Sequence, residues 1–536
     1  MTDGLEADVA VVGAGSAGAV IAARLSEDPH LRVVLLEAGV RDRSFLRDVP
    51  GITMSLVGSA DTDWCYAAEP DPTLGGRTLV WHAGRMLGGS SAINGMVYVR
   101  GLQRDYDDWR DEGCPDWGWS DVEPYFRRAE RFADEGAPSM GRDGLLDVSR
   151  IRSVHCLTGK FVDACAEIGI ERLDDYNRGD RAGAFVNFTN QRRGQRTSTA
   201  KGYLGPASRR PNLRIIRGAH VDRILFDDQR RATGVSFAAG GQVHRLAIRG
   251  EVVVSAGAIQ SPLVLMRSGI GDGNALGDAG IGVRVERPAV GRNLQDHSGP
   301  ALTAFVNVPT YNSEIGPVAG LKHVANYALF RRGPLASPAV QAMAWARSDA
   351  SAAEPDVHLN WFPFAFDYTA SPPRMHKDPA ITLAACVSRP FSRGSVHLRD
   401  ADPLSAPRIA HRLLDNECDL RTMINSIGLM KRIFAAPSLA ALCRLAGGAA
   451  DSLSAAAAEE MVRATIGLGL HAAGTCRMGS DADAVLDTDL RVRGVTGVRV
   501  ADASIMPRLV SANTNAAAIM IGERAADILR NALDNR

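Results

Sequence analysis

The feature that most constrains the fold is a glycine pattern directly behind an apolar run near the start of the chain. Residues 7–12 form an apolar run typical of a buried parallel strand, and Gly13, Gly15 and Gly18 follow in the spacing G-x-G-x-x-G. A helical pattern comes next, and a second predicted strand at 32–36 ends at Glu37. Such a β-α-β unit of about thirty residues has the size of half a dinucleotide-binding fold.

The residue types of this turn suit a pyrophosphate ligand. We expect Gly13 to allow a tight turn, Gly15 to let the backbone approach the phosphates, and Gly18 to let the helix pack on the strand. The helix N-terminus adds amide donors and the positive end of a dipole. Glu37 stands 19 positions after Gly18, where a carboxylate can accept hydrogen bonds from ribose hydroxyls. The alternative is a glycine-rich turn with an unrelated surface Glu, and the strand-turn-helix context favours the nucleotide site.

A second glycine-rich segment favours FAD over a nicotinamide cofactor. Residues 84–95 read Gly-Arg-Met-Leu-Gly-Gly-Ser-Ser-Ala-Ile-Asn-Gly, and most of these side chains are too small to fill a core. Such a segment suits a backbone that lies flat along an extended cofactor. An irregular surface loop is the alternative, but a loop this apolar would be poorly solvated.

Composition excludes several classes of protein. The 61 basic and 61 acidic side chains cancel, whereas a nucleic-acid binder usually carries a basic excess. No apolar run approaches the roughly 18 residues of a membrane span, and the acidic start lacks the positive region of a secretory signal. We therefore expect a cytoplasmic protein without a transmembrane segment, and loose membrane association stays open. The eight scattered cysteines include no C-x-x-C pair, so we expect free thiols and no metal site.

The middle and the end of the chain return to strand and helix patterns. Residues 212–255 alternate like strands, and a helix is predicted to start with Ser261 as its cap and Pro262 at its first position. A short strand at 498–501 and a final helix at 516–533 complete the pattern.

Residues 306–464 differ from both flanks and predict a second domain. They carry an Ala-rich helical stretch at 438–460 and an aromatic cluster. We hold two interpretations of that cluster as equal, a substrate pocket and plain core. The remaining residues, 1–305 and 465–536, would then form one discontinuous domain around the nucleotide site. The aromatic cluster consists of Trp345, Trp361, Phe362, Phe364, Phe366 and Tyr368.

Two polar residues near the C-terminus are candidates for chemistry. His471 lies among small apolar residues, where a lone histidine is usually a satisfied core residue, yet small neighbours also let a flat ring approach it. Asn513 precedes the final helix, so either Asn513 or Asn515 can cap that helix while the other faces a ligand. Cys476 has no activating base in its own segment, and we interpret it as structural.

Taken together, these motifs resemble those of the glucose-methanol-choline oxidoreductases, a family of FAD-dependent alcohol oxidases and dehydrogenases. The resemblance runs from the first strand almost to the C-terminus and is strongest to choline-dehydrogenase-like and hydroxymethylfurfural-oxidase-like bacterial members. It implies an α/β fold with a Rossmann-like FAD-binding domain and a second, α+β substrate-binding domain whose antiparallel sheet is backed by helices. Besides the first glycine motif, the matching segments are 84–95, 257–271, 290–297 and 500–507, followed by Asn513, Gly522 and Glu523.

The resemblance also assigns site residues. His471 corresponds to the family's active-site histidine, a general base, and Asn513 to its partner position. Some members attach FAD covalently to a histidine at the position of Ile93, so this FAD should be non-covalent. The residues expected to contact FAD are Gly13, Ala14, Gly15, Ser16, Ala17, Gly18, Glu37, Ala38, Trp64, Arg85, Met86, Gly88, Gly89, Asn94, Gly95, Val97, Val221, Ala256, Asp502, Ala503, Asn513 and Thr514.

The implied reaction is oxidation of a primary alcohol to an aldehyde, by hydride transfer to flavin N5 while His471 takes the hydroxyl proton. Oxygen or a quinone-like carrier would accept the electrons. The same framework hosts flavin-containing hydroxynitrile lyases and photodecarboxylases, and these are the alternative functions. Aryl alcohols, furans, sugars, polyols, long-chain alcohols and quaternary ammonium alcohols are all compatible with the sequence.

Overall fold

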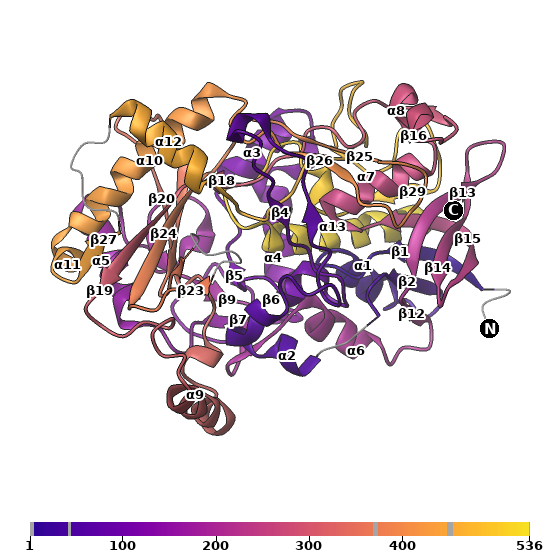
Figure 1. The fold of residues 1–536 in the computed structure, drawn as a ribbon. Coiled ribbons are helices and arrows are strands. Elements are labelled where there is room, and N and C mark those ends of the chain that lie inside the picture. Colours follow the sequence, from indigo (N-terminus) through magenta and orange to yellow (C-terminus); the bar gives the residue numbers. More distant parts are fainter. Residues whose placement is uncertain (1–4, 41–43, 368–373, 447–453, 535–536) are drawn as a thin grey trace.

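The computed structural model describes residues 5–40, 44–367, 374–446 and 454–534 (Figure 1). Two large sheets stand apart in the molecule, a seven-stranded sheet on the right of Figure 1 and a six-stranded sheet on the left. Helices from distant parts of the chain cover both. Further helices are α2 (Ser44–Asp48), α3 (Gln103–Asp111), α4 (Trp119–Ala129), α6 (Gly205–Ala207), α8 (Gly273–Asp278) and α9 (Pro317–Phe330).

The seven-stranded sheet is Rossmann-like, as predicted. Its strands run in the order β12-β2-β1-β15-β14-β13, and β29 also pairs with β15. The first four strands and β29 are parallel, while β14 and β13 form an antiparallel extension. Parallel strands are covered on both faces, which explains why β1 and β2 are almost wholly apolar. The bounds are β1 (Glu6–Val12), β2 (Val33–Glu37), β12 (Leu213–Arg217), β13 (His220–Phe226), β14 (Ala232–Ala239), β15 (Gln242–Val254) and β29 (Val498–Val500).

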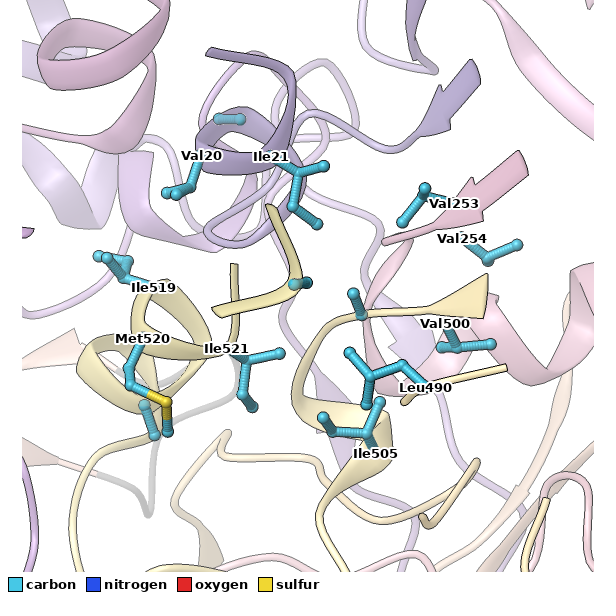
Figure 2. Packing of buried hydrophobic residues seen from close by; sticks show 14 of the residues in the cluster. Val20, Ile21, Val253, Val254, Leu490, Val500, Ile505, Ile519, Met520 and Ile521 are labelled. Carbon is cyan, nitrogen blue, oxygen red and sulfur yellow. The ribbon is translucent and has the colours of Figure 1, made fainter. Parts of the chain in front are cut away.

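The core of this half packs the first helix against the last. Helix α1 (Gly18–Leu25) and helix α13 (Thr514–Asp534) both carry apolar residues on the sides that meet the sheet. Figure 2 shows Val20 and Ile21 of α1 facing Ile519 and Ile521 of α13, with Val254 of β15 further across the same cluster. All five side chains are buried. The two ends of the chain therefore share one hydrophobic core.

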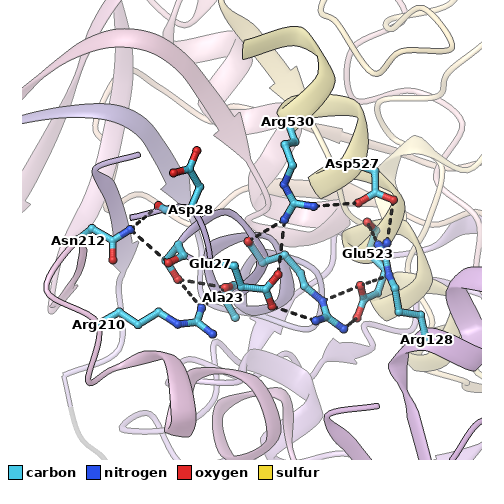
Figure 3. A network of polar contacts seen from close by, with 11 residues as sticks. Ala23, Glu27, Asp28, Arg128, Arg210, Asn212, Glu523, Asp527 and Arg530 are labelled. Atoms are coloured by element: carbon cyan, nitrogen blue, oxygen red, sulfur yellow. Dashed lines mark hydrogen bonds and ion pairs between the residues drawn. The ribbon is translucent and has the colours of Figure 1, made fainter. Parts of the chain in front are cut away.

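A buried carboxylate joins the same elements by polar contacts. Glu523 of α13 is fully buried, and it accepts hydrogen bonds from Arg24 Nε (2.9 Å), Arg128 Nε (2.8 Å) and the Tyr203 hydroxyl (2.7 Å). A buried charge is costly unless it is paired, so these three donors are required by the position of the carboxylate. Figure 3 shows Arg128 reaching Glu523 and Asp527, which lie on successive turns of the final helix.

The six-stranded sheet confirms the predicted antiparallel sheet with helical backing. Its order is β27-β19-β24-β21-β20-β8, and every pairing is antiparallel. Strand β8 and nearly all of β19 come from residues before 306, so the sheet extends beyond the range 306–464 predicted for this domain. The strands are β8 (Ala184–Val186), β19 (Ala301–Val306), β20 (Ala342–Ala346), β21 (Val357–Phe362), β24 (Ala380–Val387) and β27 (Cys443–Leu445), backed by α5 (Cys156–Glu167) and α10 (Glu417–Ala435).

Two helix predictions were wrong in detail. Helix α7 (Gly257–Arg267) begins before Ser261, and Pro262 lies inside it. The reason is non-local: the carboxylate of Asp502 accepts the Gly257 N–H (2.8 Å) and the Ser261 hydroxyl (2.6 Å), so the helix start is fixed from 245 residues away. The Ala-rich stretch is divided into α11 (Pro437–Ala440), β27 and α12 (Ala455–Thr465), and residues 447–453 lie outside the described residues.

The final helix extends slightly beyond its predicted range, from Thr514 to Asp534. Within the described residues, no helix combines the length and the apolar character that a membrane span needs. All eight cysteines are free thiols, as predicted.

Candidate active site

A cavity of about 940 Å³ lies between the two sheets. Its wall begins at the first glycine turn, where Gly13 and Gly15 contribute, and reaches His471 and Asn513 at the other end. Residues of the six-stranded sheet, such as Asn360, close that end. The cavity is therefore long and draws its wall from both halves of the molecule.

Backbone forms the wall at the nucleotide end. A Cβ added to Gly13 would lie 2.5 Å from the Ser255 carbonyl oxygen, and the φ of Gly13 is +97°, which only glycine adopts readily. Gly15 lines the cavity, and no atom lies within 4 Å of where its Cβ would be. Gly89 packs its backbone on Gly15, because a Cβ at Gly89 would lie 2.7 Å from Gly15 Cα. The two predicted glycine segments thus form one flat surface, with room for a phosphate group beside Gly15.

The carboxylate of Glu37 orders the turns around it. It accepts the Ala14 N–H (3.0 Å) and the Gly39 N–H (2.7 Å), and burial raises the pKa of Glu37 to about 7. Glu37 and Ala38 line the cavity beside the turn. A carboxylate has about four acceptor positions, so Glu37 keeps capacity for the ribose hydroxyls predicted to bind there.

The start of the final helix forms part of the same wall. Asn515 Oδ1 accepts the hydroxyl of Ser16 (2.8 Å), which holds the N-terminus of α13 against the glycine turn. Thr514 and Asn515 line the cavity, so the positive end of the α13 dipole lies at its edge.

The predicted FAD contacts divide into two groups. Five of them do not line the cavity: Ala14, Gly18, Arg85, Met86 and Gly88. The Arg85 guanidinium stacks on the Trp64 ring at 4.7 Å, and the Gly88 N–H donates to the Ala14 carbonyl (2.8 Å). Met86 and Gly18 are buried. The others line the cavity: Gly13, Gly15, Ser16, Ala17, Glu37, Ala38, Trp64, Gly89, Asn94, Gly95, Val97, Val221, Ala256, Asp502, Ala503, Asn513 and Thr514.

At the other end, a strand pairing places two histidines together. Strand β18 (Ser298–Gly299) pairs with β28 (Gly467–Leu468), which brings His297 alongside the segment that carries His471. Asp296 Oδ1 accepts a hydrogen bond from the backbone N–H of His471 (2.6 Å), and burial raises the pKa of Asp296 to about 7. Gly469 leaves room for this approach, since a Cβ there would lie 2.4 Å from the His297 carbonyl oxygen.

A chain of hydrogen bonds fixes the tautomer of His471. His297 Nε2 lies 3.0 Å from the Ser388 carbonyl oxygen, which can only accept, so Nε2 carries the proton. Burial lowers the pKa of His297 to about 4, so its ring is neutral and its Nδ1 is an acceptor. His471 Nδ1 lies 2.9 Å from that atom and must be the donor. The other nitrogen of a neutral His471 ring, Nε2, is therefore unprotonated.

This unprotonated nitrogen lies at the cavity wall, where Asn513 occupies its lone pair. Asn513 Nδ2 donates to His471 Nε2 (2.8 Å), while Asn513 Oδ1 is buried without a protein partner. Both side chains line the cavity. Burial, together with the nearby His297, lowers the pKa of His471 well below its usual 6.5. The ring is thus neutral at pH 7, and its unprotonated nitrogen and the Asn513 amide lie side by side at the cavity wall.

The aromatic cluster divides between the cavity wall and the core. Phe362 and Phe364 line the cavity. Trp361 is buried and stacks on Phe161 with ring centroids 4.9 Å apart, and Trp345 is buried and donates from Nε1 to the Ser511 carbonyl (2.6 Å). Phe366 does not line the cavity, and Tyr368 lies outside the described residues.

Sequence reasoning assigned no role to several residues that the structure places here. His297 ends the matching segment 290–297, but no spacing rule connects it to His471, which lies 174 positions later in the sequence. Arg196 donates to Asn94 Oδ1 (2.7 Å) and so orients a predicted FAD contact, and burial lowers the pKa of Arg196 to about 9. Asn360 lines the reacting end with an Oδ1 that has no protein partner.

Comparison with protein families gives two matches. A model of the N-terminal part of GMC oxidoreductases matches residues 7–299, and a model of their C-terminal part matches residues 390–522.

Known relatives align over almost the whole chain. An uncharacterized GMC-type oxidoreductase of Mycobacterium tuberculosis is 39% identical over 98% of this chain and 99% of its own length. The alcohol dehydrogenase [acceptor] of Pseudomonas putida is 38% identical over 98% and 96%. The oxygen-dependent choline dehydrogenase of Brucella anthropi is 36% identical over 98% and 95%.

Solved structures share the fold. Pyridoxine 4-oxidase from Mesorbium loti superposes with a TM-score of 0.88 at 30% identity, over 97% of this chain and 98% of that chain. An FAD-dependent oxidoreductase from Chaetomium thermophilum gives a TM-score of 0.88 at 25% identity, over 98% and 100%.

Proposed function

The chain belongs to the GMC oxidoreductase family, and from that membership we propose that it oxidises a primary alcohol to an aldehyde with His471 as general base. It is an FAD-dependent enzyme that acts on CH–OH groups. The observation that carries the finer proposal is the hydrogen-bond chain from Ser388 through His297 and His471 to Asn513, which ends at the cavity.

The nucleotide end of the cavity fits FAD. The open backbone at Gly15, the carboxylate of Glu37 and the N-terminus of α13 offer room, acceptors and a positive dipole end to an adenosine pyrophosphate. Ile93 lines the cavity with a side chain that cannot form a covalent bond to a flavin. When bound there, FAD supplies the isoalloxazine ring, whose N5 accepts the hydride from the alcohol carbon.

His471 and Asn513 would handle the hydroxyl group. A substrate hydroxyl would replace the Asn513 amide at Nε2 of His471, which takes the hydroxyl proton. The displaced Asn513 amide then donates to the same oxygen and sets its direction. General-base assistance of this kind contributes about 10²- to 10⁴-fold to a rate. His297 Nδ1 then stabilises the imidazolium by accepting a stronger hydrogen bond from His471 Nδ1.

An uncharged alcohol suits the reacting end. Phe362, Val340 and Leu468 form apolar wall near His471, and Asn360 offers an amide. Among the described residues, the carboxylates of the cavity wall lie elsewhere: Glu37 and Asp502 line the nucleotide end, and Glu314 lies beside the helix α9. Glu354, which follows in the sequence of the same domain, pairs with Arg389 Nη1 (2.7 Å).

The test is anaerobic reduction of the bound flavin by a panel of alcohols. We expect His471→Ala to keep FAD and its yellow spectrum but to lose reduction by about 10²-fold or more. His30→Ala, a change to a surface histidine outside the cavity, is the matched control. Reduction of the His471→Ala protein at the wild-type rate would contradict the proposal.

The same measurement separates the alternative functions. A hydroxynitrile lyase or a photodecarboxylase would leave its flavin oxidised in the dark with every alcohol. Admitting air after reduction shows whether oxygen is the acceptor, because the yellow colour then returns within seconds rather than hours.

A second experiment tests how the cofactor is attached. We expect acid precipitation to release all of the flavin into the supernatant, because Ile93 offers no covalent link. Colour that stays in the protein pellet would contradict this.

A further inference from the structure

Helix α9 exposes an unusual amount of apolar surface. Val318, Leu321 and Leu329 are 85%, 72% and 73% exposed, and Val324 and Phe330 are also exposed. Val318, Leu321 and Leu329 lie on one side of the helix, at the spacing i, i+3 and i+11, and Val324 and Phe330 flank them. Contiguous apolar patches on a protein surface mark interaction sites.

The opposite side of α9 belongs to the cavity. Gly320 and His323 line it, as does Ile315 just before the helix. Figure 1 shows α9 projecting from the body of the protein, below the six-stranded sheet. The exposed apolar surface therefore lies at the entrance to the cavity.

Positive charges outnumber negative ones around α9, and Glu314, just before the helix, lies 3.7 Å from His323. From residue 315 to residue 348 the sequence contains no Asp or Glu. Lys322 and Arg332 are exposed on this segment, and Arg331 ends the helix. Arg152, also exposed, donates from Nη2 to the Phe330 carbonyl (3.3 Å) and adds a further positive charge at the same end.

We propose that the exposed side of α9 inserts into the surface of an anionic lipid bilayer. A helix of 14 residues is about 21 Å long, too short to span the hydrocarbon core, so it would lie in the plane of the interface. Its apolar side chains enter the acyl region, and Lys322, Arg331 and Arg332 remain at the level of the anionic headgroups.

A second copy of the chain fits this surface less well. In a symmetric dimer built on α9, each cationic group would face the same groups of its partner. Residues 315–348 contain no carboxylate to compensate them, and the single neighbouring one, Glu314, lies against His323, so like charges in contact oppose association. An anionic membrane supplies both missing components, apolar chains and negative charge.

Docking of this kind places the entrance of the cavity against the bilayer. If the proposed alcohol oxidation holds, an apolar alcohol dissolved in the membrane can reach the cavity past Ile315 without entering water. Binding to lipid does not depend on that chemistry, so the two proposals can fail separately.

The test is sedimentation of the holoenzyme with vesicles of phosphatidylcholine, alone or mixed with phosphatidylglycerol. We expect binding to the mixed vesicles that weakens as salt is added. Leu321→Glu combined with Leu329→Glu should lower the partition coefficient by about tenfold or more, since two apolar anchors become charged. Neither side chain lines the cavity, so flavin content and reduction by a water-soluble alcohol should not change.

Val243→Glu is the matched control. Val243 is 75% exposed on β15, in the sheet on the far side of the molecule, and its substitution should leave vesicle binding unchanged. The proposal is overturned if the wild-type protein binds no vesicle, or if the double variant binds as well as wild type. It is also overturned if light scattering shows a dimer that the double variant dissociates, because a second copy then covers α9.

Discussion

The two ends of the cavity are built in different ways. At the nucleotide end, backbone forms the wall: Gly13 and Gly15 lie in one turn, and Gly89 packs on Gly15. At the reacting end, side chains form the site, and His297, His471 and Asn513 come from three segments far apart in the chain. The first end depends on the absence of a Cβ at a few positions, and the second on the orientation of three polar groups. Substitutions should therefore affect binding of FAD at one end and chemistry at the other.

The largest expected effect is at Gly15. A valine there meets no protein atom at its Cβ, so the fold should stay intact, but the side chain would occupy the space beside the turn. We expect Gly15→Val to weaken FAD binding by about a hundredfold or more with an unchanged circular dichroism spectrum. Gly277→Val, at another open glycine outside the cavity, is the control. Tight FAD binding by Gly15→Val would show that the cofactor lies elsewhere.

The next effect is at His297, which touches no substrate but orients His471. Without an acceptor at Nδ1, His471 loses the bond that keeps its Nε2 unprotonated. We expect His297→Leu to bind FAD normally and to reduce it about 10- to 100-fold more slowly. His297→Asn, which keeps an acceptor close to the Nδ1 position, should recover part of the rate.

A buried neighbour provides the control for that prediction. His358 packs edge-on against His297 with ring centroids 4.6 Å apart, yet no hydrogen bond links it to His471. His358→Leu should stay within about threefold of the wild-type rate. Equal losses in the two variants would mean that packing, rather than the tautomer, determines the rate.

A smaller effect is expected at the cavity wall. Phe362→Ala removes apolar contact near the reacting group, so we expect KM for an apolar alcohol to rise about tenfold while kcat changes little. Phe391→Ala, at an exposed phenylalanine outside the cavity, should change neither parameter. A fall in kcat alone would assign Phe362 to the reacting geometry instead.

The smallest effect is the pH dependence near neutrality. The pKa of His471 is lowered well below 6.5, so the ring is already neutral at pH 7 and kcat/KM should change less than about twofold from pH 7 to 8. Activity should fall only when acid protonates the ring. An acid limb of the kcat/KM profile centred near pH 7.5 in the wild type would contradict a His471 ring that is neutral at pH 7.

The contrast between the two ends also explains what the sequence could predict. Gly13, Gly15 and Glu37 could be found because a pyrophosphate turn demands particular residue types at a fixed local spacing. The apolar neighbours of His471 indicated a core residue as readily as a base, and its role came from the family resemblance. The prediction of Ser261 as the cap was wrong because the carboxylate that holds the helix start, Asp502, is remote in sequence.

The aromatic cluster shows the same limit in a single strand. Phe362 and Trp361 are adjacent and chemically alike, so their residue types predict the same environment for both side chains. In β21, successive side chains point to opposite faces, which places Phe362 and Asn360 at the cavity and Trp361 in the core. The register of that strand depends on its partners β20 and β24, which no local pattern specifies.

The hydrogen bond between Ser16 and Asn515 joins residues 499 positions apart, and the buried carboxylate of Glu523 on the last helix pairs with Arg24 on the first. During translation at about 5–20 residues per second, the glycine turn leaves the ribosome roughly 25 to 100 s before its partner is made. We expect the nascent chain to have no complete nucleotide site for that period. Loading with flavin would then be among the last events of biosynthesis, and truncation just before α13 should yield a colourless protein.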